Sequence, residues 1–163
     1  MSIANEITKI VVENERLTTE EKIDGVIYLA QYKCWSAPIR AKSFLETMEK
    51  GTEYSAREIS ERTTVNLKNR DYRYSGRSVG ALFKTLTKIG ALEKKVVPTG
   101  RILKIPSSTR AAYEAALMRA RLDYEYEPNL RSLEWIRICE DKLATLPEFH
   151  EIEEKITLYT RTF

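Results

Sequence analysis

The segment SGRSVGALFKTLTKIG, residues 75–90, constrains the fold more than any other part of the chain. Five apolar side chains recur in it at the three- and four-residue spacing of one helix face: Val79, Leu82, Phe83, Leu86 and Ile89. This spacing predicts an amphipathic helix over 75–89 that ends at Gly90. The other face carries cations and small residues but no carboxylate, whereas a merely solvated face would mix both signs of charge. The segment therefore predicts a helix with one buried stripe and one surface suited to an anionic partner.

Positive charge is concentrated around this helix. Residues 57–104 contain twelve Lys or Arg and four Asp or Glu, whereas residues 1–56 contain seven and nine, and residues 105–163 contain eight and eleven. The whole chain has a net charge of only +3. Such asymmetry favours a polyanion-binding segment between neutral or acidic structural segments. Chance clustering of charge on a solvated surface is the alternative interpretation.

Helix signals dominate the chain before this segment. Apolar residues at helical spacing predict a first helix near the N-terminus, and Thr18 with Glu21 forms a capping box before a second. These two helices make an accessory layer over 1–35. Ser36 as N-cap and Pro38 in the first turn predict a third helix over 37–50. Ser55 with Glu58 forms another capping box, which predicts a short fourth helix over 56–63.

The pattern changes from helix to strand after Gly90. The runs ALEKKVV and RILKI are short and rich in β-branched residues, and Pro98, Thr99 and Gly100 lie between them. This combination predicts a β-hairpin over 91–105. Pro106 closes it.

The order of these elements over 36–106 resembles a winged helix-turn-helix domain. The segment SVGALFKTLTKIGALEKK is similar to the recognition helix and first wing strand of that superfamily. Accessory helices on both sides make the general plan similar to MarR-like regulators. The connection 64–74 departs from the motif, because it is much longer than the usual turn of three to four residues. Either the fourth helix continues further, or an extra basic loop lies beside the recognition helix.

The resemblance implies a set of residues that contact double-stranded DNA. The helix 75–89 would enter the major groove, where small residues allow close approach and cations meet phosphates or guanine edges. The groove-facing residues would be Arg77, Ser78, Ala81, Lys84 and Thr85, and Ser75 and Lys88 would be further DNA-binding residues of the same helix. The phosphate contacts would be Arg57, Arg62, Lys68, Arg70 and Arg73. The wing 91–105 would contact the backbone or the minor groove through Lys94, Lys95 and Arg101.

The remaining residues, 107–163, are predicted to form further helices. STRAAYEAALMRARLDYEYE is rich in alanine, and a later helix carries Leu130, Leu133, Ile136 and Leu143. Apolar residues alternating by three and four then predict a narrow coiled-coil seam, assigned as a dimer interface: Phe149, Ile152, Ile156 and Tyr159. The alternative is that these seams pack on the chain's own N-terminal helices. In either arrangement the whole chain is expected to form one globular unit.

Nothing in the sequence favours an enzyme. The single histidine, His150, has no partner pattern, and the glycines match neither GxGxxG nor the P-loop. Cys34 and Cys139 lie far apart without a CxxC motif, so we expect buried free thiols and neither a metal nor a cofactor. The chain has no apolar run of membrane-spanning length and no signal-peptide pattern, which favours a cytoplasmic location and no membrane partner.

The sequence therefore predicts a mainly α-helical protein with a small β-hairpin, built around a winged helix-turn-helix core. The first functional interpretation is a sequence-specific transcriptional regulator that binds double-stranded DNA as a homodimer. The second uses the same fold as a protein-interaction module, as some viral or mobile-element proteins do. Composition alone does not separate the two interpretations.

Overall fold

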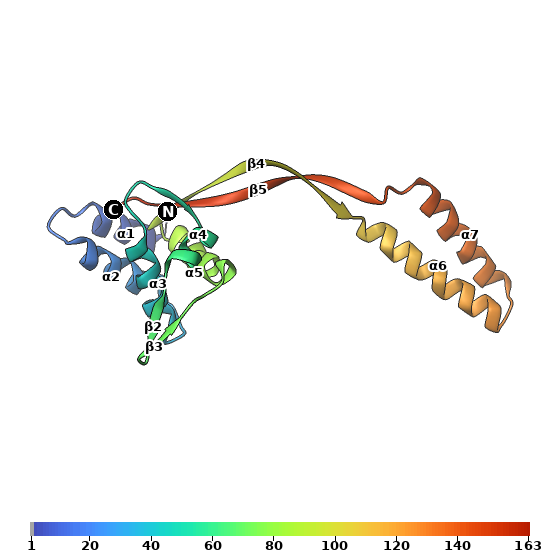
Figure 1. Cartoon of the computed structure of the whole chain (residues 1–163), viewed down its shortest axis with the longest axis horizontal. Helices are drawn as coiled ribbons and strands as arrows, with labels where there is room; N and C mark the ends of the chain where they lie inside the picture. Colours follow the sequence, from blue (N-terminus) through green and yellow to red (C-terminus); the bar gives the residue numbers. More distant parts are fainter. Residues whose placement is uncertain (1) are drawn as a thin grey trace. The chain divides into compact units, whose positions relative to one another are not determined.

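A computed structural model describes residues 2–163, which form seven helices and five strands (Figure 1). The helices are α1 (Ile3–Glu13), α2 (Thr19–Ala30), α3 (Ala37–Thr47), α4 (Ala56–Arg62), α5 (Gly76–Lys88), α6 (Ser108–Tyr126) and α7 (Leu130–Thr145). The strands are β1 (Glu53–Ser55), β2 (Val65–Leu67), β3 (Arg70–Tyr72), β4 (Leu92–Pro106) and β5 (Phe149–Arg161). The protein is mainly α-helical with a small amount of antiparallel sheet, as the sequence predicted.

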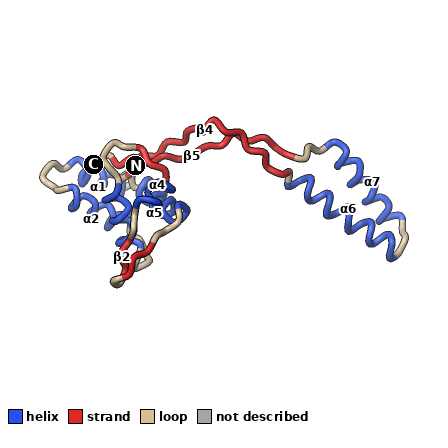
Figure 2. The backbone as a smooth tube through the Cα atoms, viewed as in Figure 1, coloured by secondary structure: helices blue, strands red, loops and turns tan. Residues whose placement is uncertain are grey.

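The chain divides into two compact units, so the prediction of one globular unit is wrong. The first unit contains the chain up to Val97 together with Lys155–Phe163, and the second contains Pro98–Glu154. Lys155–Phe163 belongs to the first unit because β5 lies between β1 and β4 in one sheet. In sequence, α6 and α7 separate β4 from β5. Figure 2 shows the two strands running side by side.

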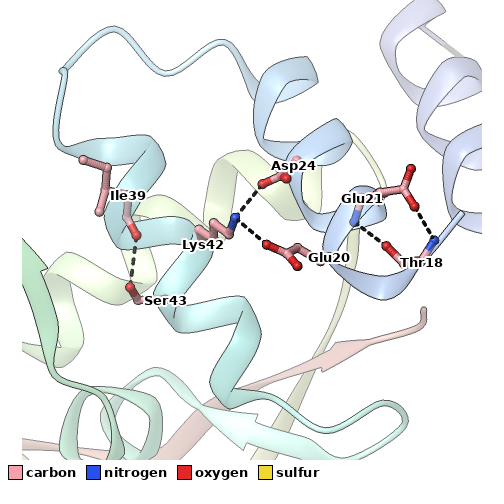
Figure 3. Close-up of polar contacts among 7 residues, drawn as sticks. All are labelled: Thr18, Glu20, Glu21, Asp24, Ile39, Lys42 and Ser43. Atoms are coloured by element: carbon pink, nitrogen blue, oxygen red, sulfur yellow. Dashed lines mark hydrogen bonds and ion pairs between the residues drawn. The ribbon is translucent and has the colours of Figure 1, made fainter.

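The predicted capping boxes start two helices of the first unit. The Thr18 hydroxyl accepts a hydrogen bond from the Glu21 amide, and the Glu21 carboxylate accepts one from the Thr18 amide, both at 3.1 Å (Figure 3). Ser55 and Glu58 make the same reciprocal pair at the start of α4. Each box satisfies two amides that a helix N-terminus leaves without partners. Both predictions are confirmed.

Helices α2 and α3 are joined by a polar contact between a half-buried lysine and two exposed carboxylates. The Lys42 ammonium of α3 lies 3.0 Å from an Asp24 carboxylate oxygen and 3.4 Å from one of Glu20, both on α2 (Figure 3). The hydrogen bond to Asp24 is the main cause that raises the pKa of Lys42 above its usual value. The two acidic residues lie one turn apart, so a single ammonium reaches both.

Aromatic packing fills the centre of the first unit. Phe44 of α3 and Phe83 of α5 are fully buried and meet edge to face, with ring centroids 6.3 Å apart. Phe83 also meets Tyr159 of β5 at 5.2 Å. Tyr159 lies opposite Tyr54 of β1 in the antiparallel register, and Phe163 joins the same cluster. The core thus combines the helices with a segment that is distant in sequence.

The hairpin predicted over 91–105 is absent from the structure of these residues, and that prediction is wrong. β4 continues through Pro98–Gly100 as one strand, and the sheet has the order β1-β5-β4. Gly100 has φ of 81°, a left-handed conformation that glycine supplies at β-bulges as well as at turns. Pro98–Gly100 therefore has the positive φ that its glycine signals, but the strand does not end there.

The C-terminal coiled-coil prediction is also wrong, because Phe149–Arg161 forms β5. This segment is rich in β-branched and aromatic residues, which favour strands. Successive side chains of a strand point to opposite faces, so Phe149 and Tyr159 lie on one face whereas Ile152 and Ile156 lie on the other. These four residues form no common seam.

The long connection 64–74 does not continue α4, which ends at Arg62, so the first predicted alternative is wrong. The connection is an extra basic element, as in the second alternative, but it is a two-stranded hairpin, β2–β3, and not an irregular loop (Figure 2). Its turn residues Lys68 and Asn69 have φ of 50° and 64°. Two residues of positive φ make the type I′ turn that suits the twist of a tight hairpin. The amide of Asn66 bridges the strands by donating to Asp71 at 3.0 Å.

The second unit contains the helical hairpin α6–α7 and the adjoining parts of β4 and β5. Leu117 and Ala120 of α6 and Cys139 of α7 are buried. The Arg110 guanidinium donates to the carbonyls of Leu143 and Leu146 at 2.9 and 2.8 Å. Arg110 therefore closes the C-terminal end of α7, where carbonyls lack helical partners.

Both cysteines are free thiols, and Cys139 is buried as predicted. Cys34 is exposed, so the prediction for that thiol is wrong. No helix of residues 2–163 is both long enough and apolar enough to span a bilayer.

Candidate nucleic-acid interface

The centre of the candidate interface is α5, whose local sequence explains its start and its buried face. The Ser75 hydroxyl caps the helix by accepting from the Ser78 amide at 3.2 Å. The predicted stripe is buried in full: Val79, Leu82, Phe83, Leu86 and Ile89. The boundaries and the buried face of this helix therefore match the prediction from sequence.

The outer face of α5 presents three cations around one small residue. Arg77, Ala81, Lys84 and Lys88 are exposed and follow one another at spacings of four, three and four residues. This spacing places them along one side of the helix. None of the three cations has an ion-pair partner within residues 2–163, and α5 contains no carboxylate. We call this set the α5 cation face.

Two other residues predicted to face the groove lie at the border of this face. Ser78 and Thr85 are half-buried, whereas Ser75 is exposed at the N-cap.

The glycines of α5 have a different role from the expected close approach to DNA. A Cβ added to Gly76 would lie 3.2 Å from the Arg57 Cα, and one at Gly80 would lie 3.7 Å from the Ala56 Cβ. Both glycines therefore face α4 and allow the two helices to pack closely.

The cations predicted on α4 are exposed, but each contacts another side chain. The Arg57 guanidinium lies 3.0 Å from a Glu61 carboxylate oxygen one turn later. The Arg62 guanidinium lies over the Tyr54 ring, 5.6 Å from its centroid. These contacts are weak at an exposed site. The two arginines thus differ from the α5 cation face, whose three cations have no ion-pair partner among the described residues.

The β2–β3 hairpin carries a second group of exposed cations. The Lys68 ammonium lies 4.7 Å from the centroid of the Trp35 ring, which is itself exposed. Arg70 and Arg73 are exposed and make no ion pair with any described residue. Trp35 was missed from the sequence, because only the fold brings the loop before α3 to the turn of the hairpin.

The three cations predicted for a wing do not form one group. Lys94 and Lys95 lie on β4 in the first unit, and Lys95 is 3.8 Å from Glu53 of β1. Arg101 belongs to the second unit, where its guanidinium lies 3.5 Å from Glu154. The reason is again the long strand, because residues 98–100 are not a turn between two wing strands.

The position of α5 is fixed by a residue that sequence reasoning missed. The Tyr32 hydroxyl donates to the Leu82 carbonyl of α5 at 2.6 Å. Burial raises the pKa of Tyr32 well above its usual value, against the opposing effect of the nearby Arg40 guanidinium. The neutral phenol therefore persists as a donor and holds α5 against the segment that follows α2.

Within the described part of the chain, no three His, Cys, Asp or Glu side chains gather as a metal site requires. Comparison of the chain with protein-family models, with curated proteins and with solved structures gives no match.

Proposed function

We propose that the first unit is a winged helix-turn-helix module that binds double-stranded DNA with α5 in the major groove. The observation that carries the proposal is the α5 cation face, with Arg77, Lys84 and Lys88 exposed and without ion-pair partners among residues 2–163. Free cations at a helix surface can neutralise phosphates and release counterions, which is the main source of affinity for DNA.

The element order supports the winged helix-turn-helix assignment. A helix (α3), a short strand, a capped helix (α4) and the basic helix α5 precede two antiparallel strands, β4 and β5. The close packing of α4 on α5 at Gly76 is the kind of contact that such a motif needs. In this proposal the β2–β3 hairpin replaces the short turn and adds Lys68, Arg70 and Arg73 to the phosphate contacts.

The residues divide between base contacts and phosphate contacts. Arg77 lies in the first turn of α5, the part of a recognition helix that reaches base edges. Beside Arg77, Ala81 leaves room for the helix to approach a base pair. Lys84 and Lys88 lie further along the face and suit phosphates. The proposed regulator would therefore be sequence-specific through Arg77 and its neighbours.

Fluorescence anisotropy with random duplex DNA at several salt concentrations tests the proposal. The variant Lys84→Ala with Lys88→Ala should bind more weakly, and its slope of log affinity against log salt should fall by about 2, one for each lost phosphate contact. The matched control is Lys9→Ala with Arg16→Ala, which removes two exposed cations of the first unit outside α5. Equal losses in both variants would refute a specific role for α5.

Selection of a preferred site from a random DNA pool then tests base reading. For the selected site Arg77→Ala should cost about 1–3 kcal/mol relative to random DNA, whereas Lys95→Ala should weaken all sequences alike. If each variant loses the same affinity on selected and on random DNA, α5 makes phosphate contacts only.

The second candidate is a protein-interaction module. The observation that favours it is the exposed apolar surface of the second unit, which includes Met118, Leu122 and Trp135. Large exposed apolar patches usually mark interaction sites. If the protein fails to bind random duplex DNA even at low salt, this candidate replaces the first.

A further inference from the structure

The outward side of α6 is an apolar stripe that the second unit leaves uncovered. Five residues follow one another at spacings of four, three, four and four: Ala111, Ala115, Met118, Leu122 and Tyr126. All five are exposed, and the exposed fractions of Met118, Leu122 and Tyr126 are 66%, 57% and 93%. We call this set the α6 stripe. Its spacing keeps it on one side of the helix over the whole length of α6.

The α6 stripe lies opposite the side of α6 that packs on α7. Leu117 and Ala120 are the buried residues of α6 and point toward the other helix of the hairpin. In a helix of 3.6 residues per turn, Ala120 is about 160° from both Met118 and Leu122. A helix with apolar residues on two opposite sides is expected to pack against two partners. In the second unit, α7 is the first of these.

Charges beside the stripe identify the second partner. Glu114 and Arg121 flank the α6 stripe on the same side, seven residues apart. In an antiparallel pair of α6 helices, Glu114 of each copy lies opposite Arg121 of the other. In a parallel two-fold pair the sides that carry Glu114 and Arg121 lie on opposite edges of the interface, so these charges do not meet. The order of charges along α6 is therefore complementary to itself in the antiparallel direction.

These charges remain accessible in a single chain. Glu114 pairs with Arg110 at 3.1 Å and Arg121 pairs with Glu140 at 3.1 Å, but the Glu114 and Arg121 side chains are 57% and 60% exposed. A second copy therefore extends two exposed ion pairs into a network and breaks neither of them. Networks of this kind contribute more than isolated surface pairs.

The sizes of the stripe residues are complementary in the same orientation. The first half of the stripe is small, Ala111 and Ala115, and the second half is large, Met118 and Leu122. An antiparallel arrangement with its two-fold axis near Met118 places the small half of one helix against the large half of the other. A hollow of about 350 Å³ beside Met118 and Leu122, between Glu114 and Glu125, leaves room for the side chains of a second copy.

We propose that the protein forms a two-fold dimer through the α6 stripe, with the two α6 helices antiparallel and Glu114 of each copy paired with Arg121 of the other. Together with α7 of each copy, the two helices make a four-helix arrangement in which both apolar sides of α6 are covered. This inference uses the second unit alone and does not rest on DNA binding.

Analytical ultracentrifugation of the full chain tests the interface. The wild type should sediment as a dimer, and Met118→Glu should shift the protein to a monomer at the same concentration. Ala116→Glu is the matched control, because it adds the same charge to the same helix at an exposed alanine outside the stripe. A wild-type monomer at all concentrations would overturn the proposal, as would a dimer that survives Met118→Glu.

Charge reversal tests the antiparallel orientation. Glu114→Arg and Arg121→Glu should each weaken the dimer at low salt, because each places like charges opposite one another. The double variant should restore the dimer, since both pairs form again with exchanged signs. Circular dichroism checks that every variant keeps its helices. A folded double variant that dimerises less than either single variant would exclude the proposed pairing.

Discussion

The two units of the chain differ in how completely they bury their apolar residues. The first unit has a continuous core drawn from α2, α3, α4, α5 and three strands, with Phe44 and Phe83 fully buried. In the second unit Leu117, Ala120 and Cys139 are buried, whereas Met118, Leu122 and Trp135 are at least half exposed. The first unit thus buries its own apolar core, whereas the second leaves large apolar side chains of both helices exposed to solvent.

This difference separates two sources of stability. Several layers of structure cover each core residue of the first unit, so its stability is intramolecular. Two helices packed on each other leave most of their surface in water and depend on a partner for further burial. Core variants of the first unit should therefore lower the free energy of unfolding at any protein concentration. Variants of the second unit should instead act by weakening association.

The largest effect is expected at the centre of the first core. Phe83→Ala removes a fully buried ring that packs on Phe44 and Tyr159, so it should cost about 3–5 kcal/mol of unfolding free energy. Urea unfolding followed by fluorescence gives the value. Leu122→Ala in the second unit is the contrasting change and should cost far less at concentrations that keep the protein monomeric. Similar losses of unfolding free energy for the two variants would contradict this difference between the units.

The next effect concerns the contact between α4 and α5. Gly76→Ala places a Cβ 3.2 Å from the Arg57 Cα, a backbone atom with little freedom to move, and should cost about 1–3 kcal/mol. Gly80→Ala meets the Ala56 Cβ at an ordinary 3.7 Å and should stabilise the helix by up to about 1 kcal/mol. Thermal unfolding of both variants provides the test. Equal shifts of one sign would show that α4 and α5 pack less closely there.

A smaller effect is expected from Tyr32, which anchors α5. Tyr32→Phe removes the hydrogen bond to the Leu82 carbonyl and should cost about 0.5–1.5 kcal/mol near neutral pH. Burial raises the pKa of the folded Tyr32 above the usual value of about 10, so above that pH the unfolded chain releases its proton first.

The stabilisation from Tyr32 is therefore complete at neutral pH and is lost as the pH rises beyond about 10. Urea unfolding between about pH 9 and pH 11 should show a steeper loss of stability for the wild type than for Tyr32→Phe. Parallel pH profiles for the two proteins would argue against a buried, neutral phenol.

The ion pairs of Lys42 should contribute less than any of these contacts. Lys42→Ala removes the exposed link from α3 to Asp24 and Glu20, and the small loss in melting temperature should shrink as salt is added. Lys33→Ala is a control at an exposed lysine of the same unit. A loss at Lys42 that stays constant with salt would indicate a packing contribution from its aliphatic stem.

The smallest effect is expected when the second unit is removed. Joining Val97 to Lys155 through an Asn-Gly turn deletes Pro98–Glu154 and converts the remaining strands into a short hairpin. Because the core cluster lies in the first unit, this shortened chain should unfold cooperatively near the wild-type denaturant midpoint. A chain without a cooperative transition would show that the first unit depends on the second.

Local signals predicted the elements whose contacts are local. The capping boxes at Thr18 and Ser55 fixed two helix starts, and the apolar spacing of α5 fixed its buried face. The candidate cations Arg77, Lys84 and Lys88 followed from the same spacing. These features depend on residues three or four positions apart, so a single sequence contains the information needed to find them.

The errors occur where the partner of a segment is distant in sequence. β4 pairs with β5 across α6 and α7, whereas the turn residues Pro98–Gly100 predicted a hairpin between neighbouring strands in place of this pairing. Ile152 and Ile156 fit helical spacing by coincidence, and pairing with another strand decides their conformation. The contact between Lys68 and Trp35 was missed for the same reason.

The pairing of β4 with β5 also sets an order of events during synthesis. The second unit, Pro98–Glu154, is synthesised before Lys155–Phe163, whereas the first unit needs Tyr159 and Phe163 to complete its core. β1 and β4 therefore lack their common neighbour β5 until the last of these residues has been added. The core of the first unit stays incomplete throughout that interval, which makes its closure a late, long-range step of folding.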